Sequence, residues 1–98
     1  MIRTQHNFLI HISASLVVVV MGMVLKISAI EWVLIVIAIG MVFSAEAFNT
    51  AIEELIDLVS PEFQEKAGKI KDITAAAVLV MAIAALVTGL IIFLPKII

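Results

Sequence analysis

Cysteine is absent from this 98-residue chain, and charged side chains are scarce. Without a thiol, the chain can form neither a disulfide framework nor a thiolate zinc site. Charged residues make up only 14% of the sequence, and the net charge of -2 is too small to indicate a nucleic-acid partner. Internal repeats and low-complexity tracts are missing as well. After these absences, the distribution of apolar residues is the main evidence for the fold class.

Apolar side chains make up 64% of the chain, whereas a soluble domain averages roughly 45–50%. A water-soluble core in a single domain of this size does not need so many apolar residues, so the sequence predicts an all-α membrane protein. No cleaved signal peptide is expected at the amino end, because the first apolar run leads on into further membrane segments.

Three apolar segments are long enough to cross a bilayer as helices, which takes about 20 residues each. The second is free of charge until Glu46, but its helical periodicity continues up to Ser60 and Pro61, so its last turns should leave the membrane. A polar connection, PEFQEKAGKIKD, then leads into the third segment, which Pro95 should close. The predicted helices lie near residues 8–26, 31–59 and 70–94.

Four polar residues follow one face of the second predicted helix. Glu46, Asn49, Glu53 and Asp57, called here the acidic stripe, fall within an arc of about 80°. A charged side chain at membrane depth costs at least roughly 2.5–3.5 kcal/mol, so such residues usually face protein or water and mark a functional path. Three spans alone can hardly enclose Glu46, which favours a homo-oligomer. Small residues that allow close helix packing form one row on the second predicted helix and another on the third. The rows are Gly40, Ser44, Ala47 and Ala51, and Ala75, Ala82, Ala85 and Gly89.

Lys71 and Asp72 precede the third apolar segment and are expected at the amino end of its helix. This position suits a phosphate group, because a helix start offers unpaired amide donors and Lys71 adds a cation. On periodicity alone, the acidic stripe also fits a merely solvated helix end. His6 and His11 fit packing at the membrane boundary better than a proton-relay or ligand role, and Trp32 fits an interfacial anchor.

The segment EAFNTAIEELIDLVSPEFQEKAGKIKDITAAAVLV, from Glu46 to Val80, resembles the signature region of the bacterial integral-membrane diacylglycerol kinase and undecaprenol kinase family. The pattern E-x-x-N-[ST]-A-I-E, followed by an aspartate and by K-D-x-x-A-A-A-V-L, is specific when its spacing is intact. RTQHNFLIHISAS and ISAIEW are closer to the undecaprenol kinase branch. The resemblance implies a homotrimeric helical bundle with three spans per subunit and a shared active site at the cytoplasmic membrane surface.

The resemblance also implies roles for single residues. Glu46 matches the catalytic base that takes a proton from the lipid hydroxyl, and Asn49 matches a polar residue of the same site. Glu53 matches a carboxylate that binds nucleotide and the Mg²⁺ of MgATP. Gln5 stands where the family generally has a second metal-binding glutamate, and an amide supplies no charge to a hard cation. The implied nucleotide contacts further along the chain are Glu62, Phe63, Gln64, Lys71 and Asp72.

The implied activity is ATP-dependent phosphorylation of undecaprenol or diacylglycerol at the inner membrane of a bacterium. Lysine and arginine counts place the amino end and the polar connection in the cytoplasm and the carboxyl end outside. Family members usually begin with an amphipathic surface helix, which residues 1–98 are expected to lack. Together with Gln5, this leaves an alternative: a weak or inactive member that serves as a structural or regulatory membrane oligomer. A pore-forming protein is a third option, but residues 8–25 and 73–94 contain no acidic residue.

Overall fold

Three long helices, each antiparallel to the next, make up the computed structural model, which describes residues 2–62 and 64–98 and, within them, the side chains from residue 7 onward. The helices are α1 (Ile2–Leu25), α2 (Ala29–Val59) and α3 (Glu65–Ile97). Each contains a stretch long and apolar enough to cross a membrane. The predicted all-α architecture with three membrane-spanning helices is therefore confirmed.

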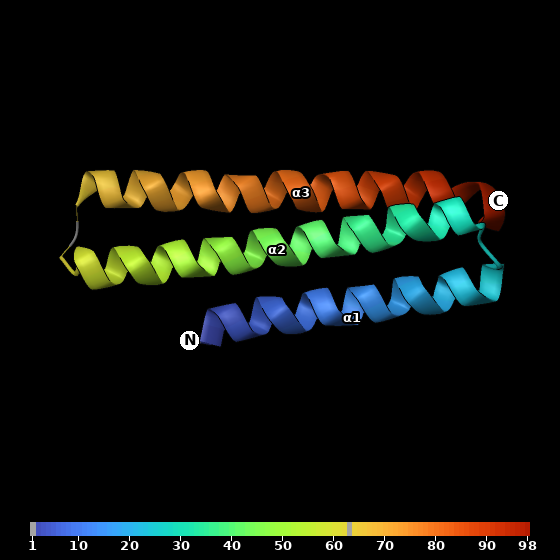
Figure 1. The fold of residues 1–98 in the computed structure, drawn as a ribbon, viewed down its shortest axis with the longest axis horizontal. Helices are drawn as coiled ribbons and strands as arrows, with labels where there is room; N and C mark the ends of the chain where they lie inside the picture. The colour runs from blue at the N-terminus through green and yellow to red at the C-terminus, as the bar shows by residue number, and fades with distance from the viewer. Residues whose placement is uncertain (1, 63) are drawn as a thin grey trace.

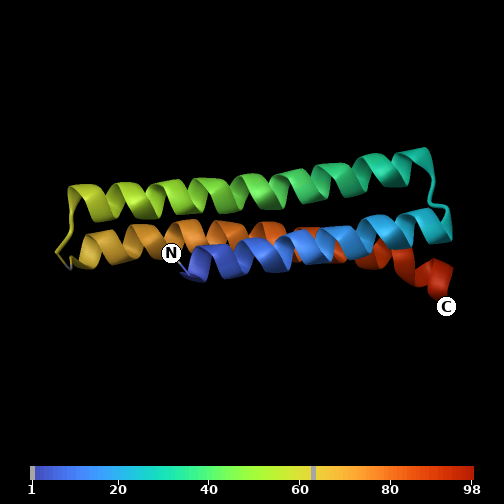
Figure 2. The same cartoon turned by 90° about the horizontal axis from the view of Figure 1, so that it is seen from below.

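In cross-section the helices form an open V with α2 at its apex. Figure 1 shows α2 between α1 and α3, and the perpendicular view of Figure 2 shows α2 displaced to one side of the other two. The amino end of α1 lies toward the end where residues 60–64 join α2 to α3, called here the connection end (Figure 1). The opposite end, where residues 26–28 join α1 to α2, is the turn end.

The turn end is built from specific capping contacts. Ser28 and Glu31 form a capping box at the start of α2, in which each side chain accepts a hydrogen bond from the other residue's amide. Lys26 adopts a left-handed conformation with φ of 53°, and the Ile27 amide donates to the Gly22 carbonyl oxygen at 3.2 Å. This six-residue closure is the Schellman motif that ends many helices. Lys96 near the end of α3 forms an ion pair with Glu31, in which Nζ lies 3.2 Å from Oε1, and this contact joins α3 to the turn.

The small apolar core also lies at the turn end. It consists of Ile27, Ile35, Ile92 and Phe93, with Trp32 packed against it. Trp32, expected as an interfacial anchor, lies over Gly22 in the α1–α2 turn. Most large apolar side chains elsewhere are exposed, which fits a protein whose surroundings are lipid.

Two predicted boundaries of the third helix are wrong. The helix begins at Glu65 rather than near residue 70, because Gly68 already donates its amide hydrogen to the Gln64 carbonyl oxygen. It also continues for two residues past Pro95 to Ile97, although proline donates no helical hydrogen bond and its ring crowds the carbonyl group four residues earlier. At about 1.5 Å per residue, the 31 residues of α2 and the 33 of α3 exceed the roughly 30 Å of hydrocarbon in a bilayer.

Candidate functional site

A cavity of about 390 Å³, called here the polar cavity, opens between the three helices. Its walls bring together three members of the acidic stripe, Glu46, Asn49 and Glu53. They lie on one face of α2 because their spacing of three and four residues matches the helical repeat. The remaining lining residues are Asn7, Ile10 and His11 from α1, Thr50 from α2, and Ala75, Val78, Leu79 and Ala82 from α3.

Glu46 is held by a residue of another helix. The Nε2 atom of His11 on α1 lies 2.9 Å from Oε1 of Glu46, and the two side chains are only 23% and 18% exposed. An ionised carboxylate can only accept hydrogen bonds, so in its carboxylate form Glu46 requires the tautomer of His11 that carries the proton on Nε2 as the donor. Hydrogen bonds to a charged group are stronger than neutral ones, so this contact restrains Glu46 where solvent is limited.

Asn49 and Glu53 form the second polar pair of the cavity. The Asn49 amide nitrogen donates to Oε1 of Glu53 at 3.5 Å, which is a long hydrogen bond. The amide oxygen of Asn49 is buried and has no hydrogen-bond partner within the described residues. A buried acceptor without a partner is costly, and rotation of the amide toward the cavity that Asn49 lines would let a ligand supply the missing contact.

Glu53 and Asn49 offer oxygen ligands to a metal ion at the polar cavity. Among the described residues, no group of three or more carboxylate or histidine side chains is close enough to hold a metal ion by itself. Glu53 and the free oxygen of Asn49 are hard ligands of the kind that Mg²⁺ prefers, and Mg²⁺ is often held by one or two carboxylates together with substrate phosphates. The pair therefore fits a metal that arrives with a phosphorylated ligand. The side chain of Gln5 lies outside the described residues.

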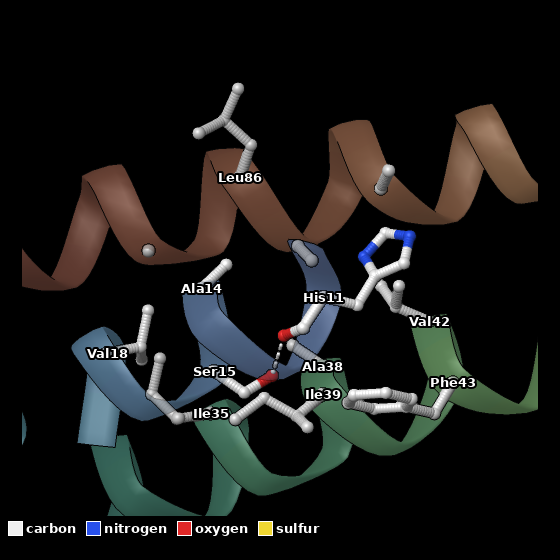
Figure 3. A pocket seen from close by; sticks show the side chains of 13 residues that line it. His11, Ala14, Ser15, Val18, Ile35, Ala38, Ile39, Val42, Phe43 and Leu86 are labelled. Atoms are coloured by element: carbon white, nitrogen blue, oxygen red, sulfur yellow. Dashed lines mark hydrogen bonds between the residues drawn. The ribbon is translucent and has the colours of Figure 1, made fainter. Parts of the chain in front are cut away.

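An apolar groove of about 230 Å³ continues from the polar cavity toward the turn end. The two share His11 and Ala82, and the groove is lined by residues of all three helices, including Ile35, Val42 and Gly89. Figure 3 shows the rings of His11 and Phe43 at one end of the groove and Val18 and Ile35 at the other. The groove is thus mostly apolar and ends at His11, which contacts the Glu46 carboxylate of the polar cavity.

Four other predicted nucleotide contacts lie nearer the connection end: Glu62, Gln64, Lys71 and Asp72. Nζ of Lys71 contacts Oδ1 of Asp57 at 2.6 Å, with side chains 36% and 59% exposed. Because α3 begins at Glu65, Lys71 and Asp72 lie nearly two turns inside the helix, so the prediction that they form its amino end is wrong. Ala75, one turn from Lys71, lines the polar cavity.

Asp72 is exposed, as are Glu62 and Gln64 in and beside the connection, and none of these three lines the polar cavity. Phe63 lies outside the described residues. The structure thus gathers Glu46, Asn49 and Glu53 at one cavity, and its lining does not include Glu62, Gln64, Lys71 or Asp72.

Sequence reasoning missed three polar residues of the polar cavity. His11 was interpreted as boundary packing, and Asn7 and Thr50 were not selected at all. A signal for two of them exists, because Asn7, His11 and Ser15 repeat every four residues and so share one face of α1. The sequence alone does not show that this face meets Glu46.

Comparison with known proteins gives consistent results along nearly the whole chain. The family model described as "Prokaryotic diacylglycerol kinase" matches residues 1–93. The undecaprenol kinase of Bacillus subtilis (strain 168) is 43% identical over 94 residues, which cover 96% of this chain and 76% of that protein.

Two diacylglycerol kinases are each 37% identical, one from Synechocystis sp. over 93 residues and one from Escherichia coli (strain K12) over 75 residues. They are matched over 94% and 76% of this chain, but over only 53% and 62% of their own lengths. The chain thus spans less than two thirds of these two relatives. No solved structure matches it.

Proposed function

Because the chain belongs to the prokaryotic diacylglycerol kinase family, and is therefore a lipid kinase, we propose that it transfers the γ-phosphoryl group of ATP to the hydroxyl group of a membrane lipid alcohol. The observation that supports this most directly is the junction of the apolar groove with the polar cavity at His11, whose Nε2 contacts Glu46 on the cavity side. A lipid in the groove would bring its polar end to a carboxylate. This is the arrangement that a lipid kinase requires.

Glu46 would act as the general base. Its carboxylate takes the proton of the lipid hydroxyl while the lipid oxygen bonds to the γ-phosphorus. The bond from that phosphorus to the β–γ bridging oxygen breaks, and ADP leaves with the electron pair. A positioned base contributes typically 10²–10⁴-fold to such a step, and most of the remaining rate enhancement in phosphoryl transfer comes from charge stabilisation and alignment.

Glu53 and Asn49 are the proposed ligands of Mg²⁺ that enters with ATP. Bound there, the ion would offset negative charge on the phosphate groups. The proposal rests on the hard oxygen of Glu53 and on the buried Asn49 oxygen that lacks a partner. Gln5 remains the predicted second position.

Lys71 is the proposed phosphate contact, with Asp72, Glu62, Phe63 and Gln64 as further nucleotide contacts. Its ion pair with Asp57 is largely exposed, and exposed pairs contribute only about 0–1 kcal/mol. A nucleotide phosphate, with more charge than one carboxylate, can therefore compete with Asp57 for Lys71. ATP would then lie against the connection end of α2 and α3.

Undecaprenol is the first lipid to test and diacylglycerol the second, since the relative matched at 43% identity is an undecaprenol kinase and those matched at 37% are diacylglycerol kinases. Apolar groove walls alone discriminate poorly between hydrocarbon chains, at roughly 1–3 kcal/mol per methylene at best. The groove therefore supports a lipid alcohol without selecting one.

The protein is further proposed to be a homotrimer in the bacterial inner membrane, with its amino end and the connection end in the cytoplasm. The lysine and arginine distribution supports the orientation. Exposed small residues on α2 support the oligomer: Gly40, Ser44, Ala47 and Ala51 are all exposed, and a Cβ placed on Gly40 would meet no atom within 4 Å. Another helix can approach closely there.

The decisive experiment supplies purified protein in mixed micelles with γ-labelled ATP, Mg²⁺ and either undecaprenol or diacylglycerol. Label should enter the lipid, and Glu46→Gln should reduce its rate by about 10²–10⁴-fold. Glu65→Gln is the matched control, because this exposed glutamate in the first turn of α3 lies away from the cavity. Absence of labelled lipid from the wild-type protein with either substrate would refute the proposal and favour the non-catalytic oligomer.

A further inference from the structure

We propose that His11 is a positioning residue for the transfer reaction: its Nε2–H holds the Glu46 carboxylate in the orientation from which it takes the lipid proton. This inference rests on the role of Glu46 under the proposed function. It assigns a task to a histidine that the sequence presents only as a boundary residue. The inference starts from a contact between two helices, at residues 35 positions apart.

Glu46 depends on this one contact. Its Oε1 lies 2.9 Å from His11 Nε2, and no other hydrogen bond or ion pair of Glu46 occurs in the part of the chain that the structure describes. A carboxylate on a flexible side chain samples several rotamers when nothing restrains it. A general base must lie within hydrogen-bond reach of the proton it removes, so its orientation affects the rate.

The imidazole ring is itself held in place. It packs edge-on against Phe43 of α2, with ring centroids 6.1 Å apart and an interplanar angle of 67°. Phe43 in turn meets Phe8 of α1 edge-on at 5.8 Å. Ser15, one turn further along α1, donates to the His11 carbonyl oxygen at 2.7 Å, as the dashed line in Figure 3 marks. The Ser15 contact holds only the backbone of His11, whereas the edge-on contact with Phe43 restrains the ring, and a restrained ring can orient its hydrogen-bond partner.

His11 also occupies the junction that a lipid hydroxyl would reach. It lines the apolar groove, the polar cavity and a third cavity of about 330 Å³ between α1 and α2. Glu46 lines the two cavities on the connection side of this junction but not the apolar groove. His11 therefore lies between the apolar surface of the groove and the carboxylate, and its polar edge faces Glu46.

A purely structural role makes a different prediction. If the contact only joined α1 to α2, loss of His11 would lower stability and reduce activity whatever residue stood at position 46. If His11 acts through Glu46, loss of His11 should lower kcat only while Glu46 is present, because residues that act as one unit show strongly non-additive effects.

The kinetic test is a double-mutant cycle on the full chain in mixed micelles. His11→Ala should lower kcat by about 10- to 100-fold, the range expected for a misplaced catalytic group, with KM for MgATP changed by less than about twofold. His11→Gln, whose amide can still donate, should recover most of the rate. In a Glu46→Gln background, His11→Ala should change kcat by less than about twofold. Leu16→Ala is the matched control, since Leu16 lies on α1 and is 61% exposed.

A second measurement separates this proposal from the proposed function. In protein labelled with ¹⁵N-histidine, Glu46→Gln should shift the Nε2 resonance of His11, assigned with His11→Gln, whereas Glu65→Gln should not. An inactive wild-type protein would refute the proposed lipid kinase function. If the Nε2 resonance of His11 does not shift in Glu46→Gln, the contact between His11 and Glu46 is refuted. Additive effects of His11→Ala and Glu46→Gln on kcat would likewise overturn the positioning role.

Discussion

Replacing Gly22 with alanine should destabilise the turn that joins α1 to α2. A Cβ atom at this position would lie 2.7 Å from Cη2 of Trp32, 3.0 Å from Cζ2 of the same ring and 3.1 Å from Cδ1 of Ile27. Carbon atoms in good contact lie about 3.5–4.0 Å apart, so the indole ring would have to move by about 1 Å. The ring is rigid and rests on the apolar core, which restricts that movement.

The expected magnitude is the difference of two effects. Inserting a methyl group into a packed site costs typically about 1–3 kcal/mol, whereas alanine in place of glycine inside a helix recovers about 0.5–1 kcal/mol. The free energy of unfolding should therefore fall by up to about 2.5 kcal/mol. The single tryptophan provides a local reporter, because its emission comes from Trp32 alone. Titration of folded protein in mild detergent with a denaturing detergent, followed by this emission, would measure the change.

Gly68→Ala is the matched control for this measurement. Gly68 is also helical, but a Cβ there would meet no atom within 4 Å, so the substitution should leave stability unchanged or raise it by about 0.5–1 kcal/mol. Trp32→Leu should make room for the added methyl and remove the penalty of Gly22→Ala; because Trp32 is the single tryptophan, the stability of this variant is followed by far-ultraviolet circular dichroism instead. If Gly22→Ala alone is as stable as the wild type with the same Trp32 emission, the indole ring does not lie on Gly22, and the packing described for the turn is wrong.

Three further predictions concern the site and the turn. Glu53→Gln removes the charge but keeps the volume, so it should raise the Mg²⁺ concentration required for lipid phosphorylation by at least about tenfold, and an unchanged requirement would place the metal elsewhere. Asp57→Asn should free Lys71 and lower KM for MgATP by up to about fivefold, because an exposed ion pair contributes at most about 1 kcal/mol. A KM for MgATP equal to that of the wild type would mean that Lys71 does not contact the phosphates. Lys26→Gly should raise the free energy of unfolding by about 0.5–1 kcal/mol in the same detergent titration, because Lys26 has φ of 53° and glycine adopts it without steric cost. A loss of stability there would contradict the left-handed turn.

The sequence by itself determined the spans and the composition of one wall of the site. Hydropathy and helical period are properties of the chain in one dimension, so three membrane-spanning helices followed directly. The shared face of Glu46, Asn49 and Glu53 followed for the same reason, since neighbours three and four residues apart on one helix meet whatever surrounds them.

Contacts between helices were decided only by the tertiary structure. The pairing of His11 with Glu46 depends on the rotation and axial offset of α1 against α2, and the pairing of Lys71 with Asp57 depends on those of α3. Neither offset is encoded by periodicity. The start of α3 at Glu65 could not be predicted from hydropathy either, because its first two turns are polar and extend beyond the apolar segment. Local patterns specify which residues share a helix face, but the packing of one helix on another decides which faces meet.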